Sequence, residues 1–163
     1  MMIGNRSLRI LVVEDDIMVA LDAAEILQGA GYNVIGVADD FQEALRVDAV
    51  RPPDLALVDL HLMGGYSGVA VAAALGKRGI DCLFVTGSAP DRAAEAYALG
   101  CLLKPFDDRS LVQAVGAAED VLAGRPVRPL PRNMRLYRRF AVPRTDGASI
   151  LPPSEEILPV SGG

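Results

Sequence analysis

Cysteine is scarce in this sequence: its 163 residues include two, Cys82 and Cys101. The two are too far apart for a Cys-x-x-Cys pair and too few for a disulfide framework, which excludes a small fold held together by disulfides. This cysteine usage agrees with a reducing compartment. We expect both residues to be small, buried apolar side chains rather than metal ligands.

Long apolar runs are lacking as well. No run approaches the roughly 18 residues that a membrane-spanning helix needs, and the N-terminal segment MMIGNRSLR lacks the apolar core of a secretory signal. We therefore expect a cytoplasmic protein without a membrane segment. Hydrophobic residues make up 51% of the sequence and charged residues 23%, which is enough for one globular domain with a sizeable core and an extension.

Basic residues are outnumbered in the first three quarters of the chain. Residues 1–123 carry nine Lys and Arg against eighteen Asp and Glu, whereas residues 124–163 carry seven Arg against three acids. The net charges of −9 and +4 together give −5. Because an acidic surface repels nucleic acid, we expect no direct DNA binding by residues 1–123.

Short aliphatic segments alternate with longer amphipathic ones. The strand-like segments are rich in β-branched residues and continuously apolar, which indicates a sheet buried on both faces; they are 8–13, 33–38, 54–59, 81–86 and 101–103. The predicted helices are 17–31, 41–50, 67–79, 91–100 and 110–124, the last with Gly124 as its stop. This alternation predicts an α/β fold with a five-stranded parallel sheet covered by helices on both sides.

The residues at the strand ends carry the chemistry. An open parallel sheet places its working residues beyond the carboxyl ends of its strands, and there the sequence has Glu14 and Asp15, then Asp59, Thr86 and Lys104. Clustered carboxylates repel one another unless a cation is bound, and oxygen-only ligands suit Mg²⁺. The next residue, Asp16, fits better as an acidic residue at a helix N-terminus.

These residue types suit phosphoryl transfer. Asp59 can act as a nucleophile, while Lys104 and a metal ion balance the charge of the phosphoryl oxygens. Thr86 can donate its hydroxyl to the same oxygens, and Gly87 leaves the approach open because it has no side chain. A dinucleotide-binding turn is excluded, since Glu-Asp-Asp stands after the first strand where glycines would be needed.

Over residues 8 to about 122 these motifs, with Pro105 and Phe106 after Lys104, resemble the response-regulator receiver domain of two-component signalling. The resemblance implies a flavodoxin-like, doubly wound sheet with strand order 2-1-3-4-5. It implies that Asp59 accepts a phosphoryl group from a phosphohistidine on a sensor histidine kinase or phosphotransfer protein. It also implies Mg²⁺ bound by Glu14, Asp15, Asp59 and the backbone carbonyl of His61, and a cis Lys104–Pro105 bond.

The span of the resemblance and the composition of the remaining residues divide the chain into two parts. We expect a receiver domain over residues 1–123 and a Pro/Arg-rich extension over 124–163, which is too short for an independent output domain with its own core. Within the extension, the segment MRLYRRF spaces Leu136 and Phe140 as on one face of a short helix. A disordered extension with polyproline character is the alternative.

Several residues depart from the family pattern. Met63 and Ser67 stand where receivers usually have Pro and Gly, and Cys101 replaces a Tyr or Phe. A switch that couples a threonine to that aromatic side chain is therefore not expected, and the loop after Asp59, with Gly64 and Gly65, is the better candidate for the moving part. The run from Phe84 to Ser88 is similar to the Phe-Ala-Thr-Gly-Tyr motif of a mostly single-domain subfamily.

Three functional hypotheses follow. The first is a phosphoacceptor, not an enzyme, that switches a protein-interaction surface for an unknown downstream protein, with a homodimer left open. The second is a phosphatase that works through an aspartyl phosphate, which is disfavoured because His61 stands where a second acid would be needed. The third is a phosphorylation-independent interaction module with a receiver fold, which the departures at Met63 and Cys101 keep open.

Overall fold

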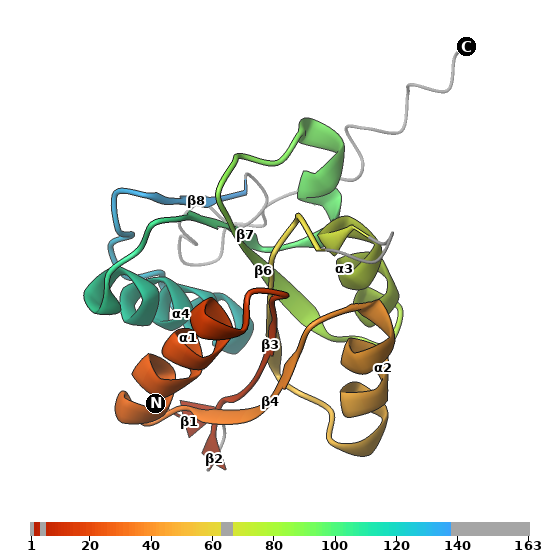
Figure 1. Ribbon diagram of the computed structural model, residues 1–163. Helices are drawn as coiled ribbons and strands as arrows, with labels where there is room; N and C mark the ends of the chain where they lie inside the picture. The colour runs from red at the N-terminus through yellow and green to blue at the C-terminus, as the bar shows by residue number, and fades with distance from the viewer. Residues whose placement is uncertain (1, 4–5, 63–66, 138–163) are drawn as a thin grey trace.

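A central sheet with helices on both faces forms the body of the protein (Figure 1). The computed structural model describes residues 2–3, 6–62 and 67–137. Five parallel strands lie in the order β4-β3-β5-β6-β7, which is the predicted order 2-1-3-4-5. Their bounds are β3 (Arg9–Val13), β4 (Asn33–Ala38), β5 (Leu55–Val58), β6 (Asp81–Thr86) and β7 (Gly100–Leu103).

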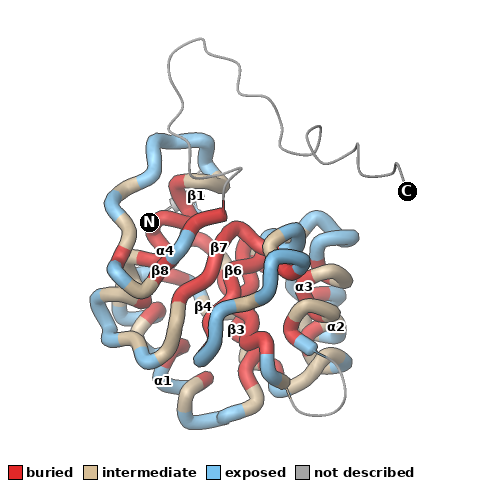
Figure 2. Tube along the Cα trace, turned by 90° about the horizontal axis from the view of Figure 1, so that it is seen from above, coloured by how far each residue is buried: buried red, intermediate tan, exposed pale blue. Residues whose placement is uncertain are grey.

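The helices form two layers. On one face of the sheet lie α1 (Ile17–Gly29) and α4 (Asp108–Ala123), and on the other lie α2 (Phe41–Val50) and α3 (Gly68–Gly76) (Figure 1). Each layer packs its apolar side chains on the sheet, so the core has two parts separated by the strands. Figure 2 shows the strands buried between helices whose outer sides are exposed, as the continuous apolar strand sequences predict.

The sheet has one strand more than the five predicted. Strand β8 (Met134–Leu136) pairs antiparallel with β7 and lies beside it in Figure 1. Met134 and Leu136 are buried while Arg135 between them is exposed, an alternation with the period of a strand. The helical turn predicted here is therefore wrong for residues 134–136, because the open edge of β7 offers unpaired backbone groups that a strand satisfies. Phe140 lies outside the described residues.

Gly100 makes this pairing sterically feasible. A Cβ atom on Gly100 would stand 2.4 Å from the carbonyl oxygen of Arg135, so a side chain would keep β8 from approaching. A second, smaller sheet, which the sequence patterns did not predict, pairs β1 (Met2–Ile3) with β2 (Arg6–Ser7) in antiparallel fashion.

The fourth predicted helix is shorter than expected. Residues 91–100 contain a 3-10 helix, η1 (Arg92–Tyr97), instead of a full α-helix. Asp91 caps it by accepting a hydrogen bond from the backbone N–H of Ala94. Ala94 is the buried residue of η1, so little apolar packing supports a longer helix before the chain enters β7. By contrast, α4 ends where predicted, at Gly124, which adopts a left-handed conformation with φ of 70°.

Candidate functional site

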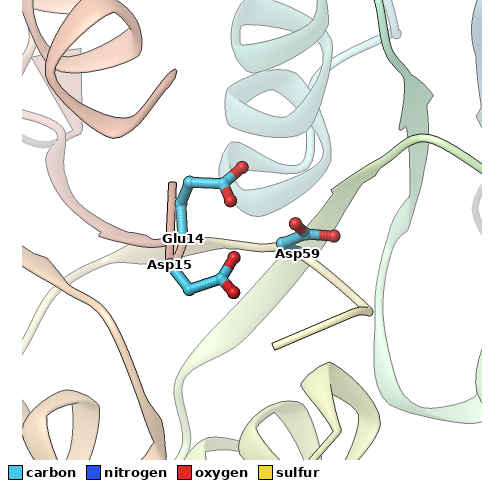
Figure 3. A group of neighbouring side chains, drawn as sticks. All are labelled: Glu14, Asp15 and Asp59. Carbon is cyan, nitrogen blue, oxygen red and sulfur yellow. The ribbon is translucent and has the colours of Figure 1, made fainter. Parts of the chain in front are cut away.

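Three carboxylates meet beyond the carboxyl ends of β3 and β5. One oxygen atom each of Glu14, Asp15 and Asp59 lies within 4.8 Å of the others. Figure 3 shows the side chains of Glu14 and Asp15 extending from the end of β3 toward the side where Asp59 lies. Glu14 and Asp59 are 5% and 7% exposed, so both are largely removed from water. The predicted acidic cluster therefore exists, and it forms because adjacent parallel strands end at the same edge.

Lys104 joins this cluster from the end of β7. Its Nζ atom donates to Glu14 Oε1 and lies 3.2 Å from Asp59 Oδ2. Burial lowers the pKa of Lys104, but the hydrogen bond to Glu14 and the charge of Asp59 outweigh it and raise the pKa overall. The ammonium group therefore stays charged at neutral pH and holds two carboxylates that would otherwise repel each other.

The ionised form of Glu14 is disfavoured at this position. Burial raises the pKa of its carboxyl group, the nearby Asp59 adds to this effect, and the hydrogen bonds from Lys104 and from the backbone of Asp16 oppose it. An ionised Glu14 thus gains from any additional cation in the hollow. Oxygen ligands this close together, partly open to water through the less buried Asp15, fit a hard divalent ion such as Mg²⁺.

Backbone groups fix the carboxylates in place. Asp59 Oδ1 accepts a hydrogen bond of 3.1 Å from the backbone N–H of His61, and Glu14 Oε2 accepts one of 3.1 Å from that of Asp16. Asp16 itself caps α1, where its side chain accepts from the N–H groups of Met18 and Val19. The interpretation of Asp16 as a helix N-terminal residue is confirmed.

Thr86 ends β6 beside the cluster. It is fully buried, and its hydroxyl oxygen has no hydrogen-bond partner within the described part of the chain. A buried hydroxyl without a partner is costly, so a ligand or water that supplied one would be favoured. The next residue, Gly87, is exposed, and an added Cβ atom would meet no atom of the described residues within 4 Å. As far as the described residues go, the approach past Gly87 is open.

The side chain of His61 also makes a contact near the site. Its Nε2 atom lies 2.7 Å from Ser88 Oγ, so the loops after β5 and β6 are linked by a hydrogen bond between exposed side chains. For His61 the family resemblance implies a role of the backbone carbonyl only, and the sequence does not predict this side-chain pair. Nothing in the local sequence connects two positions that are 27 residues apart.

The loop after Asp59 is described at its two ends. Met63, Gly64 and Gly65, which belong to the loop predicted to be the moving part, lie outside the described residues. At the far end, a Cβ atom on Gly68 would stand 2.0 Å from the carbonyl oxygen of Asp59, so glycine lets the start of α3 pack directly on the end of β5. Cys101 is buried, as expected for a small apolar residue.

Comparisons with known proteins identify the class to which this fold and site belong. The model of the response regulator receiver domain matches residues 10–116, and the chain belongs to this family. Receiver domains of this family are signalling phosphoacceptors that bind Mg²⁺ at an acidic site and interact with histidine kinases or phosphotransfer proteins. The cluster of Glu14, Asp15 and Asp59 fits the phosphorylation site of such a domain.

Among its relatives, the chain is 31% identical over 115 residues to the transcriptional regulatory protein PdtaR of Mycobacterium tuberculosis, covering 68% of this chain and 56% of PdtaR. It therefore spans little more than half of that protein. A receiver domain from Methanospirillum hungatei is 26% identical with a TM-score of 0.65, covering 72% of this chain and 98% of that chain. The receiver domain of a modulated diguanylate cyclase from Desulfovibrio desulfuricans is 32% identical with a TM-score of 0.59, covering 67% and 90%.

The cis Lys104–Pro105 peptide bond that the resemblance implied is present. Among the described helices, none combines the length and the apolar character needed to cross a membrane.

Proposed function

We propose that Asp59 accepts a phosphoryl group from a phosphohistidine on a sensor histidine kinase or a phosphotransfer protein. The observation that supports this most is the placement of Lys104 Nζ 3.2 Å from Asp59 Oδ2, beside the carboxylates of Glu14 and Asp15. In the transfer an oxygen of Asp59 bonds to phosphorus while the bond between phosphorus and the imidazole nitrogen breaks. The electron pair of that bond returns to the imidazole.

Each neighbouring side chain has a role in this proposal. Glu14, Asp15, Asp59 and the backbone carbonyl of His61 would hold Mg²⁺, which when bound supplies positive charge against the phosphoryl oxygens. Lys104 exchanges one of its carboxylate partners for a phosphoryl oxygen. The buried hydroxyl of Thr86, which has no hydrogen-bond partner among the described residues, donates to the phosphoryl group.

The proposed output is a switch in a protein-interaction surface. A phosphoryl group that binds one arrangement of Thr86 and Lys104 better than another shifts the population toward that arrangement. A downstream protein then recognises it, without direct DNA binding by this chain. In this proposal residues 1–123 form the receiver unit in the cytoplasm, and residues 124–163 add no separate output domain.

Phosphorylation can be tested on the purified chain. We expect incubation with acetyl phosphate and Mg²⁺ to add the mass of one phosphoryl group to the wild type and none to Asp59→Ala. Asp39→Ala is the matched control, because Asp39 is an exposed acid that follows β4, another parallel strand of the same sheet. Absence of an adduct under all conditions would favour the phosphorylation-independent module, and release of inorganic phosphate over many turnovers would favour a phosphatase.

Lys104 provides a second test. With Mg²⁺ bound, we expect Lys104→Ala to keep its thermal melting temperature, because the metal ion then balances the charges of Glu14 and Asp59. We expect the same variant to lose the phosphorylation-dependent binding of its partners. If the melting temperature collapses even in the presence of Mg²⁺, Lys104 is a structural residue and its proposed role in signalling is wrong.

A further inference from the structure

A segment after α4 returns along the sheet and is held at both ends. We call residues 125–137 the strap. At its start, the carboxylate of Asp120 accepts side-chain hydrogen bonds of 2.8 to 3.2 Å from Arg125 and Arg128. At its end, β8 pairs with β7, and Leu136 and Tyr137 are 7% and 3% exposed. The strap is therefore an integral part of the packed body.

Asn133 of the strap contacts the backbone on both sides of Lys104. Its carbonyl oxygen accepts a 2.8 Å hydrogen bond from the N–H of Leu103. Its side-chain Nδ2 donates to the carbonyl oxygens of Leu103 at 2.8 Å and of Pro105 at 3.4 Å. Both side-chain partners are acceptors, so the amide nitrogen is the atom that must face them. These hydrogen bonds hold the main chain on both sides of Lys104, whose side chain extends into the carboxylate cluster.

We propose that Asn133 is a positioning residue that, through the backbone of Leu103 and Pro105, holds Lys104 where it can pair with a phosphoryl group on Asp59. This inference rests on the proposed phosphoacceptor function. A displacement of about 1 Å at a reacting group is enough to slow a reaction by roughly two orders of magnitude, so a site built on a strand end depends on what holds that end. Residue 133 lies beyond the part of the chain that matches the family model.

Lys104 has opposite effects on the binding of Mg²⁺ and on phosphorylation. Its ammonium group pairs with the carboxylates of Glu14 and Asp59, so it competes electrostatically with Mg²⁺, whereas it attracts a phosphoryl group. If the loss of Asn133 loosens Lys104, the affinity for Mg²⁺ alone rises while phosphorylation slows. A general loosening of the site would weaken Mg²⁺ binding and phosphorylation together.

The experiment uses the full chain with Asn133→Ala and a matched control, Gln113→Ala. Like Asn133, Gln113 links the strap to the rest of the body through a side-chain amide: its Nε2 atom donates at 2.7 Å to the carbonyl oxygen of Pro129 in the strap. That bond does not involve the backbone around Lys104. We measure thermal melting, Mg²⁺ affinity by titration with the metal alone, and the rate of phosphorylation by acetyl phosphate. For Asn133→Ala we expect a roughly tenfold slower rate and an affinity for Mg²⁺ about twofold higher. Gln113→Ala should match the wild type.

The same substitution in a Lys104→Ala background isolates the coupling. If Asn133 acts through Lys104, its loss changes neither the Mg²⁺ affinity nor the rate once that side chain is gone. The inference is overturned if Asn133→Ala keeps the wild-type rate, lowers both quantities, or acts equally in the Lys104→Ala background. Should Asn133→Ala fail to fold, Asn133→Gln, which shifts the amide by one methylene, is subject to the same criteria.

If the proposed phosphoacceptor function is wrong, the wild type itself forms no adduct on Asp59, and this result is distinct from a failure of the inference about Asn133. The Mg²⁺ affinities of the single and double variants then decide whether Asn133 positions Lys104: a rise that depends on Lys104 supports it, and any other pattern refutes it.

Discussion

Replacing Asp120 with asparagine should detach the start of the strap at a definable cost in stability. Asp120 is 4% exposed, and hydrogen bonds from Arg128 hold the pKa of its carboxyl group at about 2, against an ordinary 3.8. The backbone N–H of Arg128 and the side chain of Arg125 add to the effect. Asparagine keeps the shape of the side chain but lacks the charge on which these bonds depend.

The size of the effect follows from this pKa. A pKa lowered on folding means that the ionised group stabilises the native state above the ordinary value of 3.8, and that this stabilisation is lost as the pH falls toward 2. The difference between these two pKa values corresponds to a stabilisation of about 2 kcal/mol at pH 7. At pH 3 roughly half of this stabilisation remains. The difference in free energy of unfolding between wild type and Asp120→Asn should therefore be smaller by about 1 kcal/mol at pH 3 than at pH 7.

Urea unfolding of both proteins at pH 7 and pH 3 measures this gap. Asp22→Asn is the matched control, because it removes the same charge from an exposed position on α1 and should change the free energy of unfolding by less than about 0.5 kcal/mol. The reasoning is refuted if Asp120→Asn costs no more than the control at pH 7, or if its cost is the same at both pH values.

Three further predictions concern the strap, the site and the thiols. Gly100→Ala should cost about 1 to 3 kcal/mol and loosen β8, because its Cβ atom would meet the carbonyl oxygen of Arg135; urea unfolding measures the cost. Burial raises the pKa of Glu14 above its ordinary 4.5, so without Mg²⁺ the wild type loses stability as the pH rises above that value, and Glu14→Gln should be more stable at pH 7 but not at pH 4. Burial raises the pKa of Cys82 to about 12 and that of Cys101 to about 11, so at pH 8 both thiols should resist alkylation while the protein is folded.

Each of these predictions has its own control. Gly76→Ala should not destabilise the protein, because its Cβ atom would meet nothing within 4 Å in the described part of the chain, and an equal loss of stability at both glycines would contradict the steric explanation. A Glu14→Gln protein that is less stable than the wild type at pH 7 would contradict the stated cause of the pKa shift. Cys101 lies on β7 opposite Arg135 of β8, whereas Cys82 lies on β6, so Asp120→Asn should speed the alkylation of Cys101 more than that of Cys82. Alkylation of Cys101 at the rate of a free thiol in the wild type would contradict its burial.

The main architecture was predictable from the sequence because it depends on local patterns. Continuous aliphatic runs predict the five parallel strands, and helical periodicity with capping residues predicts α1, α2, α3 and α4 with errors of a few residues at their ends. The exception, η1, shows the limit of such patterns. A short alanine-rich segment has helical composition, but how much of it buries depends on the neighbouring elements.

The chemical groups of the site were also evident before folding was considered. Each of these residues was recognisable because it stands at the carboxyl end of a strand, and parallel strands bring their carboxyl ends to one edge; the residues are Glu14, Asp15, Asp59, Thr86 and Lys104. Their assignment to metal binding and phosphoryl transfer stays a prediction. The distances that make it plausible, such as 3.2 Å between Lys104 and Asp59, come from the folded chain.

Contacts between distant segments could not be derived from sequence patterns. The bond between His61 and Ser88 and those of Asn133 with Leu103 and Pro105 join positions that are 27 to 30 residues apart. Strand β8 is three residues long, too short for a periodic signal, and it forms because β7 offers it an open edge. Local order is encoded by neighbouring residues, whereas these contacts exist because packing of the whole sheet and its helices brings remote backbone groups within hydrogen-bonding distance.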